Sequence, residues 1–269
     1  MAHEGRRWLA GLAAATAAGA MVLGQAAVAG AATTGTGARA SQNPTAAAIP
    51  PGYLGLGSHG PKVLALQQRL TALHYYLGKP DGKFGWNTME AVWAFKEVQA
   101  ARRTPKNPDI VGPNMFRQLK HPRLPKVLYP HKEAWRVEVN KNTEVLVVYK
   151  DRKITLISHV STAAWSRPDG TGYVTPDGKY RAQLYLRGCV ADATYGGCMY
   201  NPVFFIGTSY AIHGMPNPTT TFSFDGVPLN PASHGCVRVP MDVSVIFHNK
   251  VHVSSTRGTP IYIYGNNRN

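Results

Sequence analysis

The sequence predicts a mainly β domain, a sandwich or half-open barrel with one packed helix, preceded by a small three-helix module. Between residues 54 and 122 the apolar residues recur at helical spacing, and from residue 133 onward they alternate with polar residues as in strands. Of the 269 residues, 44% are apolar and 10% are aromatic, which is enough for packed cores and argues against global disorder.

Residues 1–29 have the layout of a secretory signal peptide. Arg6 and Arg7 precede an apolar run, and Ala27-Val28-Ala29 has the small residues of a cleavage site. The two arginines leave a twin-arginine export route open, and an uncleaved N-terminal anchor is the alternative to a signal. No cysteine stands directly after the apolar run, which excludes a lipid-modified cysteine. In either case we expect the folded part to be extracytoplasmic.

The charge balance favours a polyanionic partner. Lysine and arginine outnumber aspartate and glutamate by 29 to 14, a formal net charge of +15. Such an excess suits a protein that works beside a polyanion, through counterion release and electrostatic accumulation. Nucleic acid, anionic lipid and an anionic cell wall all meet this description. Because export is expected, anionic wall polymers are the expected partners and nucleic acid is not.

The helical module is expected over residues 54–122, after a flexible linker at 30–53 whose composition cannot offset the entropy of ordering. Gly60-Pro61 is a helix start, and the residues after it recur at helical spacing: Val63, Leu66, Leu70 and Leu73. Asn87 followed by Glu90 resembles a capping box that opens a second helix. A third short helix is expected after Pro113.

The segment at residues 123–132 is short, basic and proline-rich, and this composition predicts a stiff connection to a second domain at 133–269. Only residues 241–249 of this domain, after Pro240, have a helical pattern. The other apolar runs predict strands, at residues 135–139, 145–149, 154–160, 180–186, 203–206, 210–213 and 260–264. Gly, Pro, Asn and Asp punctuate these runs, as expected of a mainly β domain.

The candidate chemistry lies near the end of the chain, where Ile212-His213-Gly214 precedes Ser233-His234-Gly235-Cys236-Val237-Arg238. A thiol is mostly protonated at neutral pH, and a neighbouring imidazole can take its proton to give a reactive thiolate. Gly235 has no side chain to block an incoming carbonyl, and it permits a bend in which successive N–H groups face one oxyanion. The pattern therefore predicts a cysteine nucleophile.

The string from Ser233 to Arg238, with Ile212-His213-Gly214 upstream, closely resembles the L,D-transpeptidase family with its YkuD-type catalytic domain, over about residues 133–265. Further similar segments are Trp135-Arg136-Val137-Glu138-Val139, Val160-Ser161-Thr162 and Thr175-Pro176-Asp177-Gly178-Lys179-Tyr180. The resemblance implies a cysteine acyltransferase that acts on peptidoglycan stem peptides.

The same resemblance implies residue roles. Cys236 would be the nucleophile and His213 its general base, with Gly214 orienting the imidazole through its backbone carbonyl. The amides around Gly235 and Cys236 would form the oxyanion hole. Substrate binding would fall to Ser233 and His234, which shape the loop, and to Arg238, which would hold a substrate carboxylate or the loop itself. The interval between His213 and Ser233 is longer than usual, with the excess in the loop at 215–228, so the lid differs in shape.

In the implied reaction, Cys236 attacks the carbonyl of the third residue of a tetrapeptide stem and expels the terminal D-Ala, leaving a thioester. The side-chain amine of a neighbouring stem then forms a 3→3 cross-link, whereas water would make the protein an L,D-carboxypeptidase. A non-catalytic wall-binding protein and a zinc D,D-peptidase are the alternatives from other classes. A zinc site at His213, His234 and Cys236 lacks an evident fourth ligand, and no metal or cofactor is expected.

The helical module resembles the peptidoglycan-binding module of bacterial wall enzymes. The resemblance rests on residues 60–95, including Asp81-Gly82 and Gly85, for which core or turn roles are also expected. It implies a three-helix fold that holds glycan or stem peptide. We therefore expect an exported, cell-wall-associated monomer.

Three cysteines in an exported chain leave one unpaired. Cys189 and Cys198 bracket a Gly-rich loop, and we predict that they form a disulfide worth about 2.5–3 kcal/mol by loop entropy. Two reduced thiols are the alternative. Cys236 would then be the free thiol, as its proposed chemistry demands.

Overall fold

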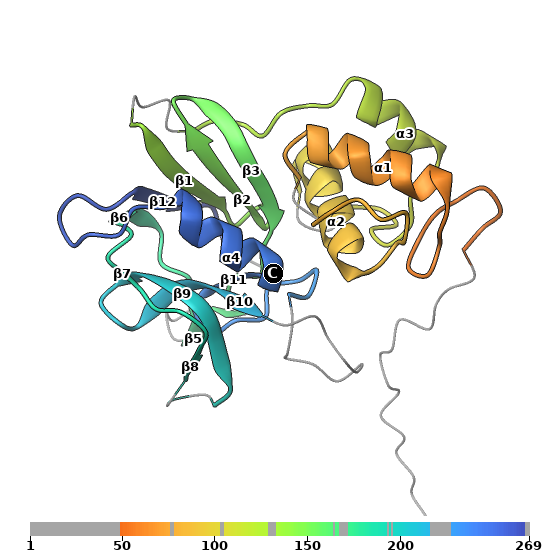
Figure 1. The fold of residues 1–269 in the computed structure, drawn as a ribbon. Coiled ribbons are helices and arrows are strands. Elements are labelled where there is room, and N and C mark those ends of the chain that lie inside the picture. The colour runs from red at the N-terminus through yellow and green to blue at the C-terminus, as the bar shows by residue number, and fades with distance from the viewer. Residues whose placement is uncertain are drawn as a thin grey trace, which may run out of the picture. The chain divides into compact units, whose positions relative to one another are not determined.

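The structure is a computed structural model that describes residues 49–75, 78–102, 105–128, 133–163, 165–166, 172–192, 194, 196–215 and 227–266. All of them belong to one compact unit, Ala40–Asn269 (Figure 1). The expected signal peptide at 1–29, most of the linker at 30–53 and most of the expected lid at 215–228 lie outside the described residues. In the described part of the chain, every helix is too short or too polar to cross a membrane.

The N-terminal module contains three helices, α1 (Pro61–Ala72), α2 (Trp86–Ala100) and α3 (Pro113–Lys120). Pro61 and Pro113 each occupy the first helical position after a glycine, where the missing N–H costs nothing. The core side chains of this module include Val63, Leu70, Val92, Phe95 and Met115. The predicted start of the first helix and the existence of the third are confirmed.

The predicted capping box at Asn87 and Glu90 is wrong. Helix α2 begins at Trp86 after Gly85, and no side chain caps it. Asn87 is the second residue of the helix, and its Nδ2 donates to Asp242 Oδ2 at 2.7 Å. Glu90 is 3% exposed and lies in the interior of the helix. The spacing of three residues reflects a shared helix face and not a cap.

The second domain contains two five-stranded sheets (Figure 1). The first has the order β3 (Lys153–His159), β2 (Val145–Lys150), β1 (Trp135–Asn140), β12 (Pro260–Tyr264) and β6 (Gly178–Arg181). The second has the order β11 (Val237–Pro240), β10 (Tyr210–Met215), β9 (Cys198–Ile206) and β7 (Leu184–Tyr185), and β8 (Cys189–Ala191) also pairs with β9. A separate ribbon pairs β4 (Trp165–Ser166) with β5 (Gly172–Tyr173).

One hydrophobic core joins these two sheets and helix α4 (Met241–Lys250). The first sheet contributes residues such as Val137 and Leu146, the second contributes Phe205 and Ile212, and α4 contributes Phe247. The mainly β domain with one packed helix is therefore confirmed.

The predicted strand run at 180–186 is divided between the two sheets. Strand β6 ends at Arg181 and pairs with β12 of the first sheet, whereas β7 begins at Leu184 and pairs with β9 of the second. At the crossing, the Ala182 N–H donates to Thr259 O at 2.9 Å and the Gln183 N–H donates to Phe204 O at 2.8 Å. Backbone bonds to both sheets thus fix the point at which the chain changes layers.

Strand β2 is buried on both faces. Leu146 and Val148 belong to the core between the two sheets, whereas Val145, Val147 and Tyr149 belong to the core of the helical module. At the neighbouring strand β3, the Ile157 N–H donates to His74 O at 2.8 Å. The helical module therefore shares its hydrophobic core with the outer face of the first sheet.

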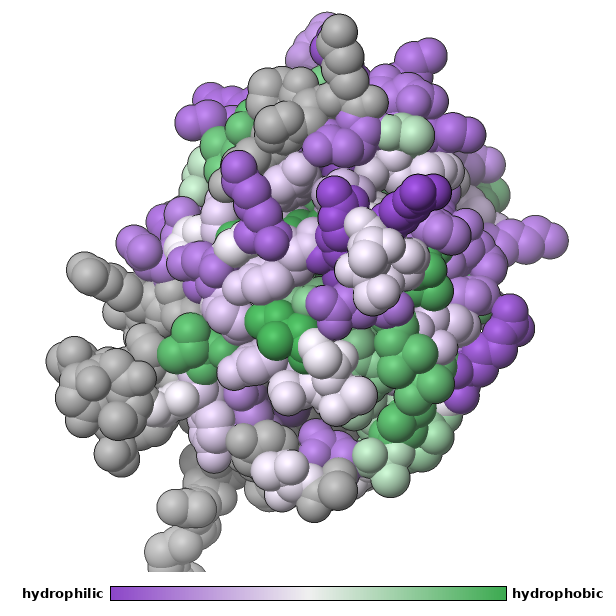
Figure 2. Space-filling view, turned by 90° about the vertical axis from the view of Figure 1, so that its left-hand side faces the viewer, coloured by the Kyte–Doolittle hydropathy of each residue, from purple (hydrophilic) through white to green (hydrophobic). Residues whose placement is uncertain are grey.

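Figure 2 shows one face of the molecule, on which small hydrophobic patches lie between hydrophilic side chains. The exposed large apolar residues of the described chain include Leu184 on the edge strand β7 and Leu186 just after it. Strand β7 has only two residues, and a very short edge strand offers little for another chain to pair with.

Candidate active site

Strands β10 and β11 place the histidine and the cysteine of the sequence motif on neighbouring strands. The two strands are parallel, with Ile212 opposite Val237 and His213 opposite Arg238. Cys236 comes directly before β11, two residues from the partner of His213, an offset of about 6.6 Å along a strand. Ile212 and Val237 point into the core. Because side chains alternate, His213 lies on the other face, together with Arg238.

A bulge in β9 lies opposite the histidine. Ile212 pairs with Val203 and Gly214 pairs with Tyr200, so Asn201 and Pro202 together face the single residue His213. Asn201 has the left-handed backbone conformation that a bulge requires, with φ of 50°. Its side chain accepts from the Gly188 N–H at 3.0 Å and donates to Ser244 Oγ at 3.2 Å. The bulge thereby adjusts the strand next to His213.

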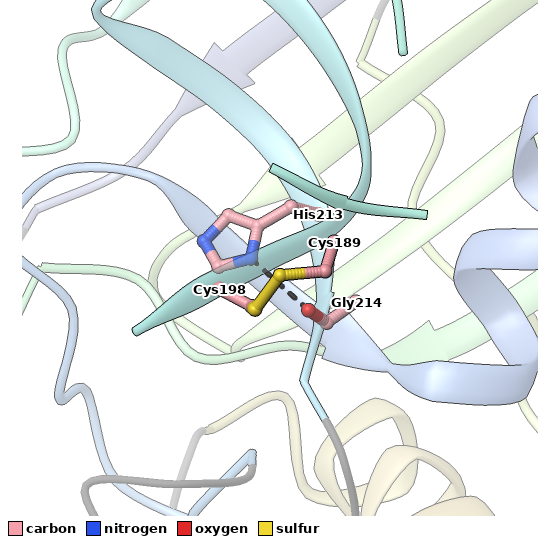
Figure 3. Close-up of a disulfide and its surroundings, with 4 residues drawn as sticks. All are labelled: Cys189, Cys198, His213 and Gly214. Carbon is pink, nitrogen blue, oxygen red and sulfur yellow. Dashed lines mark hydrogen bonds between the residues drawn. A yellow bond between two sulfur atoms is a disulfide. The ribbon is translucent and has the colours of Figure 1, made fainter. Parts of the chain in front are cut away.

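The imidazole of His213 is held in one orientation. Its Nδ1 donates to the carbonyl oxygen of Gly214 at 3.2 Å (Figure 3), so Nε2 is the nitrogen with the free lone pair. His213 is 5% exposed, and burial lowers its pKa to about 4, with the Gly214 carbonyl opposing this shift and the charge of Arg238 adding to it. The ring is therefore neutral near pH 7 and able to accept a proton.

Gly214 is required by the packing of helix α4 against β10. A Cβ at this position would lie 2.4 Å from Ser244 Oγ and 2.8 Å from Ser244 Cβ. Real Cβ atoms do not approach other atoms so closely, so a side chain here would push the helix away from the strand. The carbonyl that orients His213 thus belongs to a residue fixed by close packing.

The sulfur of Cys236 is partly buried and contacts backbone groups at the start of β10. Sγ accepts from the Ala211 N–H at 3.4 Å and donates toward Ser209 O at 3.9 Å. Burial raises the pKa of the thiol, and the Ala211 N–H opposes this shift. Burial also lowers the pKa of His213, so burial favours a protonated thiol and a neutral imidazole over a preformed thiolate–imidazolium ion pair.

The loop that carries the cysteine is braced by Ser233. Its hydroxyl donates to Cys236 O at 2.6 Å and accepts from the Gly235 N–H at 3.1 Å. Gly235 has φ of 141°, and a Cβ there would lie 2.6 Å from Tyr210 Cε1. Only glycine fits this position. Because Ser233 takes the Gly235 N–H in this structure, the Cys236 amide is the better candidate for an oxyanion donor.

The two remaining motif residues flank this loop. The ring of His234 meets the edge of Tyr173 at 4.4 Å between centroids. Arg238 is 8% exposed, and its backbone exchanges hydrogen bonds with Ser161 in both directions, at 2.9 and 3.0 Å. No local pattern points to Tyr173, whereas the Asn201-Pro202 pair just before the predicted strand at 203–206 is a visible sign of the bulge.

The predicted disulfide between Cys189 and Cys198 is present, and Cys236 is the free cysteine of the described chain. The bridge joins β8 to β9 and lies beside the His213 ring in Figure 3. In the loop that it closes, the Thr194 N–H donates to Asp192 Oδ1 at 2.9 Å. The negative charge of Asp192 is a minor influence that raises the pKa of His213.

Among the described residues, no three His, Cys, Asp or Glu side chains are grouped so as to hold a metal ion.

Comparison with known proteins places the two domains in two families. Residues 134–263 match the L,D-transpeptidase catalytic domain of the YkuD type, and residues 59–102 match a peptidoglycan-binding domain described as putative. No curated protein matches the chain.

Three solved structures illustrate the range of similarity. An L,D-transpeptidase from Xylanimonas cellulosilytica is 30% identical with a TM-score of 0.65, and the match covers 80% of this chain and 98% of that one. One from Stackebrandtia nassauensis is 19% identical, with a TM-score of 0.44 over 78% of this chain and 94% of that one. The catalytic domain of an E. faecium L,D-transpeptidase acylated by ertapenem is 20% identical, with a TM-score of 0.37 over 50% of this chain and 99% of that one.

These findings define the class of protein: a peptidoglycan-acting enzyme in which a peptidoglycan-binding module is followed along the chain by a YkuD-type catalytic domain. The chain belongs to the L,D-transpeptidase family.

Proposed function

We propose that this protein is an exported peptidoglycan L,D-transpeptidase that forms 3→3 cross-links through a thioester on Cys236. The observation that supports the proposal is the pairing of β10 with β11, which brings the segment with the partly buried Cys236 thiol next to the strand that carries the His213 imidazole. The imidazole is already in the tautomer that a general base needs, because Gly214 O takes its Nδ1 proton.

In the first half-reaction, Sγ attacks the carbonyl carbon of the third residue of a tetrapeptide stem while His213 Nε2 takes the thiol proton. The sulfur–carbon bond forms, and the carbonyl oxygen becomes an oxyanion. The carbon–nitrogen bond to the terminal D-Ala then breaks as His213 returns the proton to the leaving amine. A thioester and free D-Ala result, with His213 neutral again.

In the second half-reaction, the side-chain amine of a neighbouring stem attacks the thioester carbonyl and gives a proton to His213. The carbon–sulfur bond breaks and the thiolate recovers that proton. If water attacks instead, the product is a shortened stem, and the protein is an L,D-carboxypeptidase. The Cys236 amide would donate to the oxyanion in both steps, and one such donor is worth about 3–4 kcal/mol of barrier.

The helical module supports the choice of substrate. Its family match is to a peptidoglycan-binding domain, and the chain carries a formal net charge of +15, which suits an anionic wall. We propose that Ser233, His234 and Arg238 contact the stem peptide beside the cysteine, that the protein acts as a monomer in the wall, and that residues 1–29 direct its export.

The test is acylation followed by product analysis. Ertapenem contains a strained β-lactam carbonyl, so incubation should add one drug mass to wild-type protein at Cys236 and none to Cys236→Ala. Incubation with purified tetrapeptide muropeptides should then give 3→3 dimers that the alanine variant does not form. Shortened stems without dimers would identify the carboxypeptidase. Wild-type protein that takes up no drug and leaves the muropeptides unchanged would favour a non-catalytic wall-binding protein.

A further inference from the structure

Four ionisable side chains are buried where the helical module meets the first sheet. Glu90 and Glu97 come from α2, Glu144 from the turn between β1 and β2, and His159 from the end of β3, and each is at most 3% exposed. Burying such groups costs several kcal/mol unless they are paired or neutral. The mechanism above uses none of them, so their presence calls for a physical explanation.

On the module side, Glu97 is joined to His159. Glu97 Oε2 lies 3.1 Å from His159 Nδ1, and His159 Nε2 lies 2.9 Å from Pro228 O. A carbonyl only accepts, so Nε2 carries a proton. Burial raises the pKa of Glu97 well above its usual value and lowers that of His159, which favours a neutral carboxylic acid that donates to Nδ1. The helical module thus holds the backbone at Pro228, eight residues before Cys236.

On the sheet side, both carboxylate oxygens of Glu144 accept hydrogen bonds from the same residue, Thr162. Oε2 accepts from the Thr162 N–H at 2.6 Å, and Oε1 accepts from the Thr162 hydroxyl at 2.7 Å. The backbone of Glu144 is left-handed, with φ of 49°, and its carbonyl accepts from the Val160 N–H at 2.8 Å. Two short bonds in a dry environment fix Thr162 firmly.

Thr162 in turn holds the loop that carries the cysteine. Its carbonyl oxygen accepts from the Ala232 N–H at 3.0 Å and from the Ser233 N–H at 2.9 Å. The Ser233 hydroxyl then bonds both Gly235 N and Cys236 O. An unbroken series of hydrogen bonds therefore leads from Glu144 through Thr162 and Ser233 to the backbone of Cys236.

We propose that Glu144 is a positioning residue for the Cys236 loop, and that Glu97 of the helical module supports the same loop from its other end through His159 and Pro228. In this arrangement the wall-binding module is a structural part of the catalytic site and not only a tether. The inference rests on the proposed role of Cys236 as the nucleophile.

The first test removes the acceptor. In the full chain, Glu144→Leu leaves Thr162 without its two acceptors, and the loop moves. We expect the maximal rate constant of ertapenem acylation at Cys236 to fall about 10- to 100-fold, as small misplacements do, with the half-saturating drug concentration unchanged. Glu144→Gln can accept from the Thr162 N–H and donate to its hydroxyl, so it should restore most of the rate. Intact-mass spectrometry over time gives both constants.

The matched control is Glu90→Leu. It makes the same change at a buried carboxyl whose Oε2 has no hydrogen-bond partner among the described residues, so acylation should proceed at the wild-type rate. On the module side, Glu97→Leu should slow acylation, whereas Glu97→Gln, which can still donate to His159 Nδ1, should not. If Glu144→Leu does not fold, Thr162→Val decides, because it removes only the hydroxyl contact.

The outcomes separate this inference from the proposed function. A Glu144→Leu protein that acylates at the wild-type rate would overturn the positioning role while leaving Cys236 as the nucleophile. Equal slowing by Glu90→Leu would overturn it as well, since a general loss of packing would then explain the effect. A wild-type protein without any adduct at Cys236 would instead refute the proposed function before a variant is compared.

Discussion

The environment of His213 bears on how the proposed nucleophile Cys236 would be activated. Burial favours a neutral ring and a protonated thiol, so under the proposed mechanism the proton would move during the attack on the carbonyl and not before it. A solvent-exposed histidine and cysteine of ordinary pKa would behave differently. In the protonation of its resting nucleophile, the site is more similar to a hydroxyl nucleophile with a general base than to a preformed thiolate.

This environment predicts the acidic limit of activity. Since the folded pKa of His213 is lowered to about 4, protonation disables the base only below that value. The rate constant of ertapenem acylation should therefore hold as pH falls from 7 to 5 and drop near pH 4, not near the ordinary histidine value of about 6.5. Circular dichroism over the same range is the control for unfolding. A limb centred at the ordinary value would show that the ring is more solvated than the structure indicates.

At the scale of the elements, the disulfide fixes the hairpin of β8 and β9 beside His213. It should stabilise the fold by about 2.5–3 kcal/mol through the entropy of the closed loop. A reductant should therefore lower the melting temperature of wild-type protein by roughly 5–12 °C, given about 2–4 °C per kcal/mol for a chain of this size.

Two variants check that the shift comes from the bridge. The double variant Cys189→Ala with Cys198→Ala should have a lowered melting temperature that the reductant does not change. The melting temperature of Cys236→Ala should fall in the reductant as that of wild type does. An unchanged melting temperature for reduced wild-type protein would mean that the hairpin is held by strand pairing alone.

Local patterns predicted most elements, because the signals that specify them lie within the elements themselves. Proline at the first helical position predicted the start of α1, and two neighbouring apolar runs predicted the strands of the β2–β3 hairpin. The split of 180–186 was not predictable, since alternation continues through Ala182 while bonds to Thr259 and Phe204 decide the crossing. Strand β11 was missed for the same reason, because only its pairing with β10 makes it a strand.

The candidate site divides in the same way. Cys236 and His213 stand in a compact motif, so the sequence suggested them as a pair. Glu144 and His159 carry no local sign of a role, because their partners Thr162 and Glu97 lie 18 and 62 residues away along the chain. The wrong capping-box prediction has the same origin. Asn87 and Glu90 share one face of α2, and the role of Asn87 there depends on a distant residue of the second domain, Asp242.

At the scale of the whole molecule, the carboxyls buried between module and sheet make stability depend on pH. Burial raises the pKa of Glu90 to about 8, and the charge of Asp242 adds to the shift. A raised carboxyl contributes stability that is fully present below its unfolded pKa and is lost as pH rises through the folded value. Between about pH 4.5 and 8 this group should therefore weaken the fold by up to roughly 1.4 kcal/mol per pH unit.

Glu90→Gln removes this titration. We expect urea unfolding of the variant to show a flatter dependence of the free energy of unfolding on pH, and greater stability than wild type at pH 8. Asp151→Asn changes an exposed carboxyl in the β2–β3 turn and should leave the dependence as it is. Parallel curves for wild type and Glu90→Gln would show that this carboxyl stays charged in the fold.

Strand β2 is packed on both faces, and this limits how the helical module could be exchanged for another domain. The helical module packs on four apolar residues of the first sheet: Val145, Val147, Tyr149 and Ile157. Replacing this module with an unrelated domain would expose these apolar side chains to water, and the product would be prone to aggregate. Exchange of the module therefore requires a new domain with a matching apolar surface.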